Sequence, residues 1–130
     1  MRLNTLNKSE RLSSKKLIKE LFDKGSSFYL YPFKVYFLRQ TPEEDHNQIL
    51  FSVSKRNFKR AVDRNLLKRR MREAYRLNKQ CLSDETSLLI AYIYTSKKIL
   101  NYSEIEDKLK QTLNRLLDKD LSLEQNAKKK

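Results

Sequence analysis

Residues 53–76 read VSKRNFKRAVDRNLLKRRMREAYR and join the end of a strand, a basic loop and a long helix. Ten Lys or Arg and two acidic residues fall within residues 55–76, so this segment carries a net charge of +8. With a step of about 100° per residue, the helix predicted over residues 61–79 separates cations from apolar side chains. The cationic side comprises Arg64, Asn65, Lys68, Arg69, Arg72 and Arg76, and the apolar side comprises Leu66, Leu67, Met71, Ala74 and Leu77.

Four of these cations, Arg64, Lys68, Arg72 and Arg76, are spaced by four residues, where like charges repel and cost helix stability. The whole chain carries 29 Lys or Arg against 16 Asp or Glu, a formal charge of +13. Both features predict a polyanionic partner that neutralises the charge. The alternatives are a solvated basic helix without a partner and a basic helix on anionic lipid. The apolar side lacks the Trp and Phe residues that insert into membranes.

A first helix is predicted ahead of the strands. Ser13 or Ser14 can cap its start, because a short hydroxyl accepts a bond from an unpaired first-turn N–H. Gly25, the only glycine of the chain, is expected to end the helix through its freedom to take positive φ. The helical spacing of four apolar residues predicts one buried face, formed by Leu17, Ile18, Leu21 and Phe22.

Three segments are predicted to form strands. Residues 28–39 are rich in aromatic and β-branched side chains, and Pro32 should divide them into a short and a longer strand. Residues 49–53 follow a polar turn at residues 41–48, which predicts an antiparallel hairpin with the preceding strand. Residues 87–95 are apolar at consecutive positions and are expected to form a buried central strand.

A last helix completes the predicted fold. Ser103 to Glu106 has the spacing of a capping box, and residues past Asp120 are polar and expected to fray. The order α-β-β-β-α-β-α predicts an α+β fold, a two-layer α/β sandwich on a small mixed sheet. We expect one RNA-binding domain over residues 1–130, ordered over about residues 9–118. The apolar stripe of the last helix comprises Ile105, Leu109, Leu113, Leu116 and Leu117.

Catalytic chemistry finds little support in the sequence. The single histidine, His46, lies in an acidic turn and is expected to be solvated. The sequence has no Cys and His residues at the spacing of a zinc site, no glycine-rich loop for a phosphate and no Ser–His–Asp set. No catalytic side chain is therefore predicted. Carboxylates at the start of the last helix are interpreted as structural, because they favour the helix dipole. They are Glu104, Glu106 and Asp107.

We expect a cytoplasmic location. Residues 1–7 lack the apolar core of a secretory signal, and no stretch is long and apolar enough to span a bilayer. Cys81 is the only cysteine, which excludes an internal disulfide and agrees with a reducing compartment. We interpret it as a small, partly buried thiol.

The sequence VSKR at residues 53–56, a basic loop, and RNLLKRRMRE at residues 64–73 resemble the signature of bacterial ribonuclease P proteins. The resemblance extends over about residues 9–118 and includes the element order and the charge. Leu66 stands at a motif position that is usually arginine, and Arg70 supplies a cation elsewhere. Tyr92 stands near a place where the family often has arginine.

The resemblance implies a fold with a left-handed crossover between parallel strands, and a function. In this family the protein joins a catalytic RNA, ribonuclease P RNA, and the holoenzyme is an endonuclease that removes the 5′ leader of precursor tRNA by hydrolysis. The RNA is expected to hold the Mg²⁺ ions, so the protein relieves repulsion between two RNAs and grips the leader.

Two sites are implied by the resemblance. The first should face the catalytic RNA, because Arg forks onto phosphate and Asn bonds backbone or base edges. It comprises Lys55, Arg56, Lys59, Arg60, Arg64, Asn65, Lys68, Arg69 and Arg72. The second is a cleft between the first helix and the sheet, where aromatic faces stack on unpaired leader bases. It comprises Ile18, Phe22, Phe33, Lys34 and Tyr36, although Ile18 and Phe22 also fit an ordinary core.

Two other functions remain open from the residues. One is a non-catalytic ribosomal or RNA-assembly protein, which would bind RNA without affecting precursor tRNA processing. The other is a DNA-binding regulator that reads the major groove with the basic helix. The sequence shows no paired helix or dimer interface for that mode, so no DNA partner is expected.

Overall fold

The computed structural model describes residues 10–40, 47–81 and 87–128, with the side chains of Cys81 and of residues 119–128 excepted. The predicted element order α-β-β-β-α-β-α is confirmed. The division of residues 28–39 by Pro32 is also confirmed, and the Tyr31–Pro32 peptide bond is cis. The elements are α1 Lys15–Lys24, β1 Ser26–Leu30, β2 Phe33–Arg39, β3 Gln48–Val53, α2 Ala61–Asn78, a 3₁₀ turn η2 Lys79–Cys81, β4 Leu88–Tyr94 and α3 Tyr102–Lys128.

The four strands form one mixed sheet in the order β1-β2-β4-β3. β2 is antiparallel to β1 and β4, whereas β3 is parallel to β4. The predicted hairpin between β2 and β3 is therefore wrong, because β4 lies between them. β4 is buried at nearly every residue, because a strand at the centre of the sheet is covered on both faces. The path β3–α2–β4 is the crossover for which the resemblance implies a left-handed sense.

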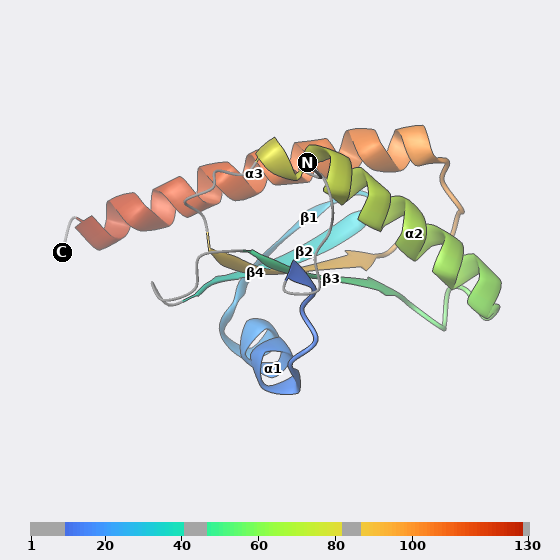
Figure 1. Ribbon diagram of the computed structural model, residues 1–130, viewed down its shortest axis with the longest axis horizontal. Coiled ribbons are helices and arrows are strands. Elements are labelled where there is room, and N and C mark those ends of the chain that lie inside the picture. The colour runs from blue at the N-terminus through green and yellow to red at the C-terminus, as the bar shows by residue number, and fades with distance from the viewer. Residues whose placement is uncertain (1–9, 41–46, 82–86, 129–130) are drawn as a thin grey trace, which may run out of the picture.

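Helices cover both faces of the sheet (Figure 1). α2 and α3 lie together over one face, and the main hydrophobic core fills the space between them and the strands. α1 lies on the other face, where a smaller cluster joins Leu21 to Leu89 and Ala91. Because side chains alternate along each strand, every strand residue belongs to one of these two faces.

The first helix begins as predicted and ends differently. Ser14 is its N-cap, and its Oγ accepts from the backbone N–H of Leu17 at 3.3 Å. Gly25 ends the helix, but with φ of −73°, so the expected positive φ is wrong. Glycine is required here by close approach instead. A Cβ at Gly25 would lie 2.3 Å from the carbonyl oxygen of Leu21 and 2.9 Å from that of Phe37.

The last helix is capped two residues earlier than predicted, at Asn101 rather than Ser103. The Asn101 side chain accepts from the N–H of Glu104 at 2.9 Å and donates to its carboxylate at 3.2 Å. The first contact is that of an N-cap, and the second joins the two side chains. α3 then continues to Lys128, past Asp120, beyond which the sequence predicts fraying. Glu106, which the sequence paired with Ser103, bonds to Asn78 and Tyr102 instead.

Some expectations concern residues outside the described ranges. They are the turn at residues 41–46 with His46, and the thiol of Cys81. Across the described ranges, none of the helices combines the length and the apolar character needed to cross a membrane.

Candidate nucleic-acid interface

The helix α2 has one buried side, as predicted, with two corrections. Leu67, Met71 and Ala74 are buried against the sheet and α3. Leu77, assigned to the same side, is 40% exposed, and the fully packed residue there is Tyr75. Tyr75 stacks edge-on against Phe51 of β3 at 6.1 Å between ring centroids. Burial raises the pKa of the Tyr75 hydroxyl, so it stays neutral in the core.

Cations occupy the loop before α2 and the outward side of its first three turns. Within the described part of the chain, none of these cations has a carboxylate partner. Six are exposed and Lys68 is half-buried, and exposed Asn65 lies among them. We call this set the cation surface. It comprises Lys55, Arg56, Lys59, Arg60, Asn65, Lys68, Arg69 and Arg72.

Arg64, the first cation of the predicted row, has a different role in the fold. Its Nη1 donates to the carbonyl oxygens of Phe58 at 2.7 Å and Lys59 at 2.9 Å. Phe58 is itself buried beside Tyr94, at 5.9 Å between ring centroids. Arg64 therefore ties the basic loop to the start of α2. Its remaining N–H groups are the part of the guanidinium that can meet a phosphate.

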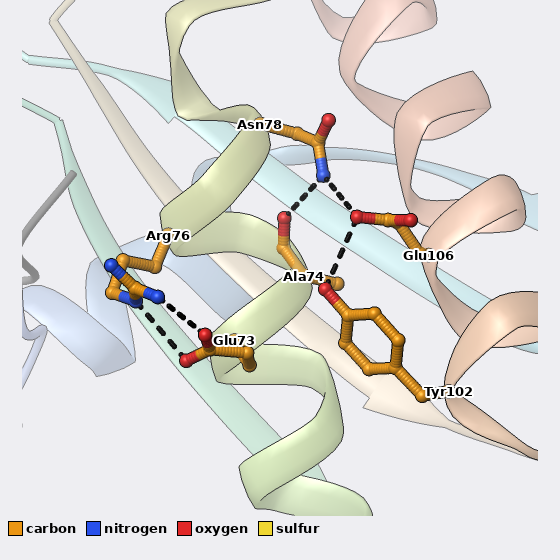
Figure 2. A network of polar contacts seen from close by, with 6 residues as sticks. All are labelled: Glu73, Ala74, Arg76, Asn78, Tyr102 and Glu106. Atoms are coloured by element: carbon orange, nitrogen blue, oxygen red, sulfur yellow. Dashed lines mark hydrogen bonds and ion pairs between the residues drawn. The ribbon is translucent and has the colours of Figure 1, made fainter.

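Arg76, the last member of the predicted row, is paired within the helix (Figure 2). Its Nε donates to Glu73 at 3.1 Å, and its Nη2 also contacts the Glu73 carboxylate. The hydrogen bond from Arg76 lowers the pKa of Glu73. The predicted row of four cations is thus reduced at both ends. Among the described residues, the α2 cations that make no ion pair and no bond to a carbonyl are Lys68, Arg69 and Arg72.

The C-terminal half of α2 is joined to α3 by a second set of polar contacts, which Figure 2 shows on the other side of the helix from Arg76. Asn78 donates to the carbonyl oxygen of Ala74 at 2.8 Å and to Glu106 at 3.1 Å. The Tyr102 hydroxyl donates to the same Glu106 oxygen at 3.1 Å. Arg70 adds a contact to the loop before α3, from Nη1 to the carbonyl oxygen of Leu100. These contacts hold α2 in place beneath the cation surface.

The second predicted site lies on the α1 face of the sheet, with one correction. Along β2, Phe33, Val35 and Phe37 point into the main core, whereas Lys34, Tyr36 and Leu38 point toward α1. Phe33 is fully buried and packs against Tyr92 at 5.5 Å, so it is not accessible to a nucleotide. The two-residue period of a strand already separates Phe33 from Tyr36.

The remaining members of the second site are close to one another. Phe22 of α1 meets Tyr36 edge-on at 4.7 Å between ring centroids, and Phe22 is 40% exposed. The Nζ of Lys34 lies 5.1 Å from the centroid of the Tyr36 ring. Ile18 is half-buried and packs against the small cluster beneath α1. We call Ile18, Phe22, Lys34 and Tyr36 the aromatic face.

The basic loop of the first site and Lys34 of the second lie at the same end of the sheet. β3 and β4 run parallel and finish level, because Val53 pairs with Tyr94, and Tyr94 also pairs with Phe33 at the start of β2. Lys34 is the next residue of β2, and the basic loop follows β3 directly. Asn57 of that loop donates to the carbonyl oxygen of Thr95 at 3.4 Å. A single polyanion could therefore contact both the cation surface and the aromatic face.

Tyr92, which stands near a family arginine, is fully buried. Its hydroxyl lies 2.7 Å from the Oγ1 of Thr112 on α3, and burial raises its pKa. It therefore contributes to the core and not to either surface. Within the described ranges, His, Cys, Asp and Glu side chains nowhere gather in threes that could hold a metal ion.

Comparisons with known proteins agree on one family. A sequence model described as Ribonuclease P matches residues 6–117. A ribonuclease P protein component of Porphyromonas gingivalis is 37% identical over 117 residues, which cover 85% of each chain. One from Chlorobium phaeobacteroides is 41% identical over 86 residues, covering 63% of this chain and 59% of that one.

Solved structures show the same fold. The RNase P protein of Staphylococcus aureus superposes with a TM-score of 0.72 at 27% identity, covering 84% of this chain and 96% of that one. The RNase P protein of Thermotoga maritima gives a TM-score of 0.70 at 26% identity, covering 82% of this chain and 96% of that one. The shared sequence and fold show that this chain belongs to the ribonuclease P protein family.

Proposed function

We propose that this chain binds the RNA of ribonuclease P through its cation surface and the 5′ leader of precursor tRNA through its aromatic face. As a family member, the chain is a protein subunit of ribonuclease P, an endoribonuclease of tRNA processing. The division of labour between its two surfaces follows what the family resemblance implies. Two observations carry it: cations without a carboxylate partner in the described ranges lie on α2 and its preceding loop, and a partly exposed pair of aromatic rings lies on the α1 face of the sheet.

The cation surface suits a folded RNA because none of its charges has a carboxylate partner within the described ranges. Each cation that meets a phosphate releases counterions, which makes RNA binding favourable and dependent on salt. Arg residues can also donate two parallel bonds to one phosphate. Because α2 is held by its buried side and by Asn78 and Arg70, it presents Lys68, Arg69 and Arg72 from a fixed position.

The aromatic face suits unpaired nucleotides. Phe22 is exposed on α1, and Tyr36 beside it is half-buried, so each leaves part of a ring for stacking. Base stacking on an aromatic ring tolerates any sequence, as a leader that differs between tRNA precursors requires. Lys34 lies over Tyr36 and can meet a backbone phosphate next to a stacked base.

In this proposal the RNA, and not the protein, binds the Mg²⁺ ions. The described part of the chain has no cluster of carboxylates to hold the ion, whereas phosphate oxygens are ligands that Mg²⁺ prefers. The protein supplies charge and position, and the reacting groups are those of the RNA. The cytoplasmic location stays a prediction.

Reconstitution tests the assignment. The chain is added to a bacterial ribonuclease P RNA at low Mg²⁺, and leader removal from precursor tRNA is measured with and without it. We expect faster cleavage with the protein. Cleavage that is unchanged, while the RNA is still bound, would favour the ribosomal or RNA-assembly alternative.

A charge-matched pair of variants tests the cation surface. Lys68→Ala/Arg69→Ala/Arg72→Ala should weaken binding to ribonuclease P RNA and reduce the slope of log K against log salt by about 2–3. The control Lys15→Ala/Lys16→Ala/Lys19→Ala removes the same charge from exposed positions of α1. Equal losses in the two variants would mean that net charge, and not this surface, governs assembly.

A further inference from the structure

Two tyrosines outside both sites are exposed at the same end of the sheet. Tyr29 of β1 is 55% exposed and Tyr31, in the turn before β2, is 46% exposed. Each offers a large apolar ring for stacking, and no other ring stacks on either among the residues described. We call Tyr29 and Tyr31 the tyrosine patch.

Hydroxyl contacts hold both tyrosines against the segment that follows β4. The Tyr31 hydroxyl lies 2.9 Å from the Oγ of Ser96, and the Tyr29 hydroxyl lies 3.4 Å from the Oγ1 of Thr95. Thr95 is fixed in turn by the carbonyl oxygen of Pro32, to which its Oγ1 donates at 2.9 Å. The Tyr31 ring is therefore anchored at its tip, with Tyr29 close to the same segment. A ring held in place loses little entropy when a base stacks on it.

The tyrosine patch continues the aromatic face. Tyr29 pairs directly with Lys34 across β1 and β2, and paired residues of antiparallel strands share one face of the sheet. Lys34 in turn lies over the Tyr36 ring. A path thus runs from Phe22 on α1 through Tyr36 and Lys34 to Tyr29, and reaches Tyr31 beside Ser96.

The charge along this path fits a polyanion. Three segments meet here, residues 26–39, 54–60 and 94–101, and none of them contains an Asp or Glu. They contribute exposed Lys34, Lys97 and Lys98 as well as the basic loop. Aromatic rings among cations, without acidic residues, are typical of surfaces that bind single-stranded nucleic acid.

We propose that Tyr29 and Tyr31 stack on unpaired nucleotides of the leader beyond those bound by Phe22 and Tyr36, so that the protein binds long leaders more tightly than short ones. This inference rests on the proposed function, because it needs a leader on the aromatic face. Stacking on a ring contributes roughly a fivefold or greater gain in affinity per base. The gain should appear only when the leader is long enough to reach the tyrosine patch.

The test compares precursor tRNAs that carry a long leader, a leader of a few nucleotides, and none, bound to the reconstituted holoenzyme. Tyr29→Ala/Tyr31→Ala should lose about fivefold or more in affinity for the long leader, and should bind the short leader as the wild type does. Tyr29→Phe/Tyr31→Phe keeps both rings and should retain most of the gain. Leu77→Ala changes an exposed apolar residue at the far end of α2 and should change nothing.

A second measurement reports on stacking itself. A leader with 2-aminopurine at its distal positions should lose fluorescence on binding to the wild type and to the Phe variant, but not to the Ala variant. Thermal unfolding of each variant shows whether the fold is intact. If the Ala variant binds the long leader and quenches its distal base as the wild type does, the inference is overturned.

If the proposed function itself is wrong, the same experiment should give a different result. In that case the wild-type holoenzyme would not distinguish precursor tRNA from the form without a leader, and Tyr36→Ala would be silent. A leader preference that depends on Tyr36 but not on Tyr29 and Tyr31 would leave the proposed function in place and remove only the tyrosine patch.

Discussion

Arg64, in the first turn of α2, donates its Nη1 to the carbonyl oxygen of Phe58 at 2.7 Å, and so fastens the basic loop to the helix that follows it. A second bond from the same nitrogen reaches the carbonyl oxygen of Lys59 at 2.9 Å. The basic loop supplies four cations of the cation surface, so its conformation decides where those charges lie.

Arg64→Ala should therefore act on both stability and RNA binding. Loss of bonds from a charged donor to two carbonyls should lower the free energy of unfolding by about 1 kcal/mol, measured by urea denaturation. Affinity for ribonuclease P RNA should fall more than it does for Arg69→Ala, because the loop cations are displaced as well. Arg69→Ala should leave stability within about 0.5 kcal/mol of the wild type. Equal binding losses with equal stabilities would show that Arg64 acts only as another surface charge.

Alanine substitutions of Tyr36 and Phe33, three residues apart on β2, should affect different properties of the protein. Tyr36→Ala should weaken binding of precursor tRNA to the holoenzyme by about 1–3 kcal/mol and leave mature tRNA unaffected. Phe33→Ala should instead lower the free energy of unfolding by about 3–5 kcal/mol, because it opens a cavity in the main core. Binding of both tRNAs per folded molecule should then be unchanged. Equal losses of precursor and mature tRNA in Tyr36→Ala would identify Tyr36 as a core residue.

Gly25→Ala should destabilise the protein even though its φ is ordinary. A methyl group there would approach two backbone carbonyl oxygens, of Leu21 and Phe37, at 2.3 Å and 2.9 Å. Backbone atoms cannot move aside as a side chain does, so we expect a loss of ~3 kcal/mol in the free energy of unfolding. The neighbouring exposed Lys24→Ala should lie within about 0.5 kcal/mol of the wild type. A stable Gly25→Ala would mean that α1 can shift away from β2.

Tyr102 should make stability depend on alkaline pH. Burial, with a smaller effect of the hydrogen bond to Glu106, raises the pKa of Tyr102 from 10.0 to about 12. In that interval the unfolded chain loses the tyrosine proton while the folded protein keeps it, so stability falls as pH rises. Urea denaturation across the interval should show a shallower fall for Tyr102→Phe than for the wild type. Parallel curves would show that the Tyr102 proton is not linked to folding.

Several features of this protein depend only on neighbouring residues and could be read from the sequence. The spacing of Leu67, Met71 and Ala74 predicts the buried side of α2, because it reflects helix geometry within a few turns. Ser14 predicts the start of α1 for the same reason. The basic segment predicts a polyanion partner, because ten cations in 22 residues stay close together in any fold.

Other features depend on residues far apart in the chain. β4 lies between β2 and β3 in the sheet. The turn residues 41–48 could not indicate this, because the neighbour of each strand is decided by the burial of β4 on both faces. Glu106, which the sequence predicted to cap α3, bonds instead with Asn78, 28 residues earlier in the chain. The exposure of Tyr29 and Tyr31 likewise follows from where α1 and the segment after β4 lie.

The sequence by itself determined the helices, the strands and the presence of a concentrated positive charge, because local periodicity and composition survive any arrangement of the elements. Only the tertiary structure decided which of those charges stay unpaired. Arg64 donates to loop carbonyls, Arg70 donates to a carbonyl 30 residues away, and Lys68, Arg69 and Arg72 have no carboxylate partner within the described ranges. Pairing requires groups within a few ångströms, and that proximity is a property of the folded chain.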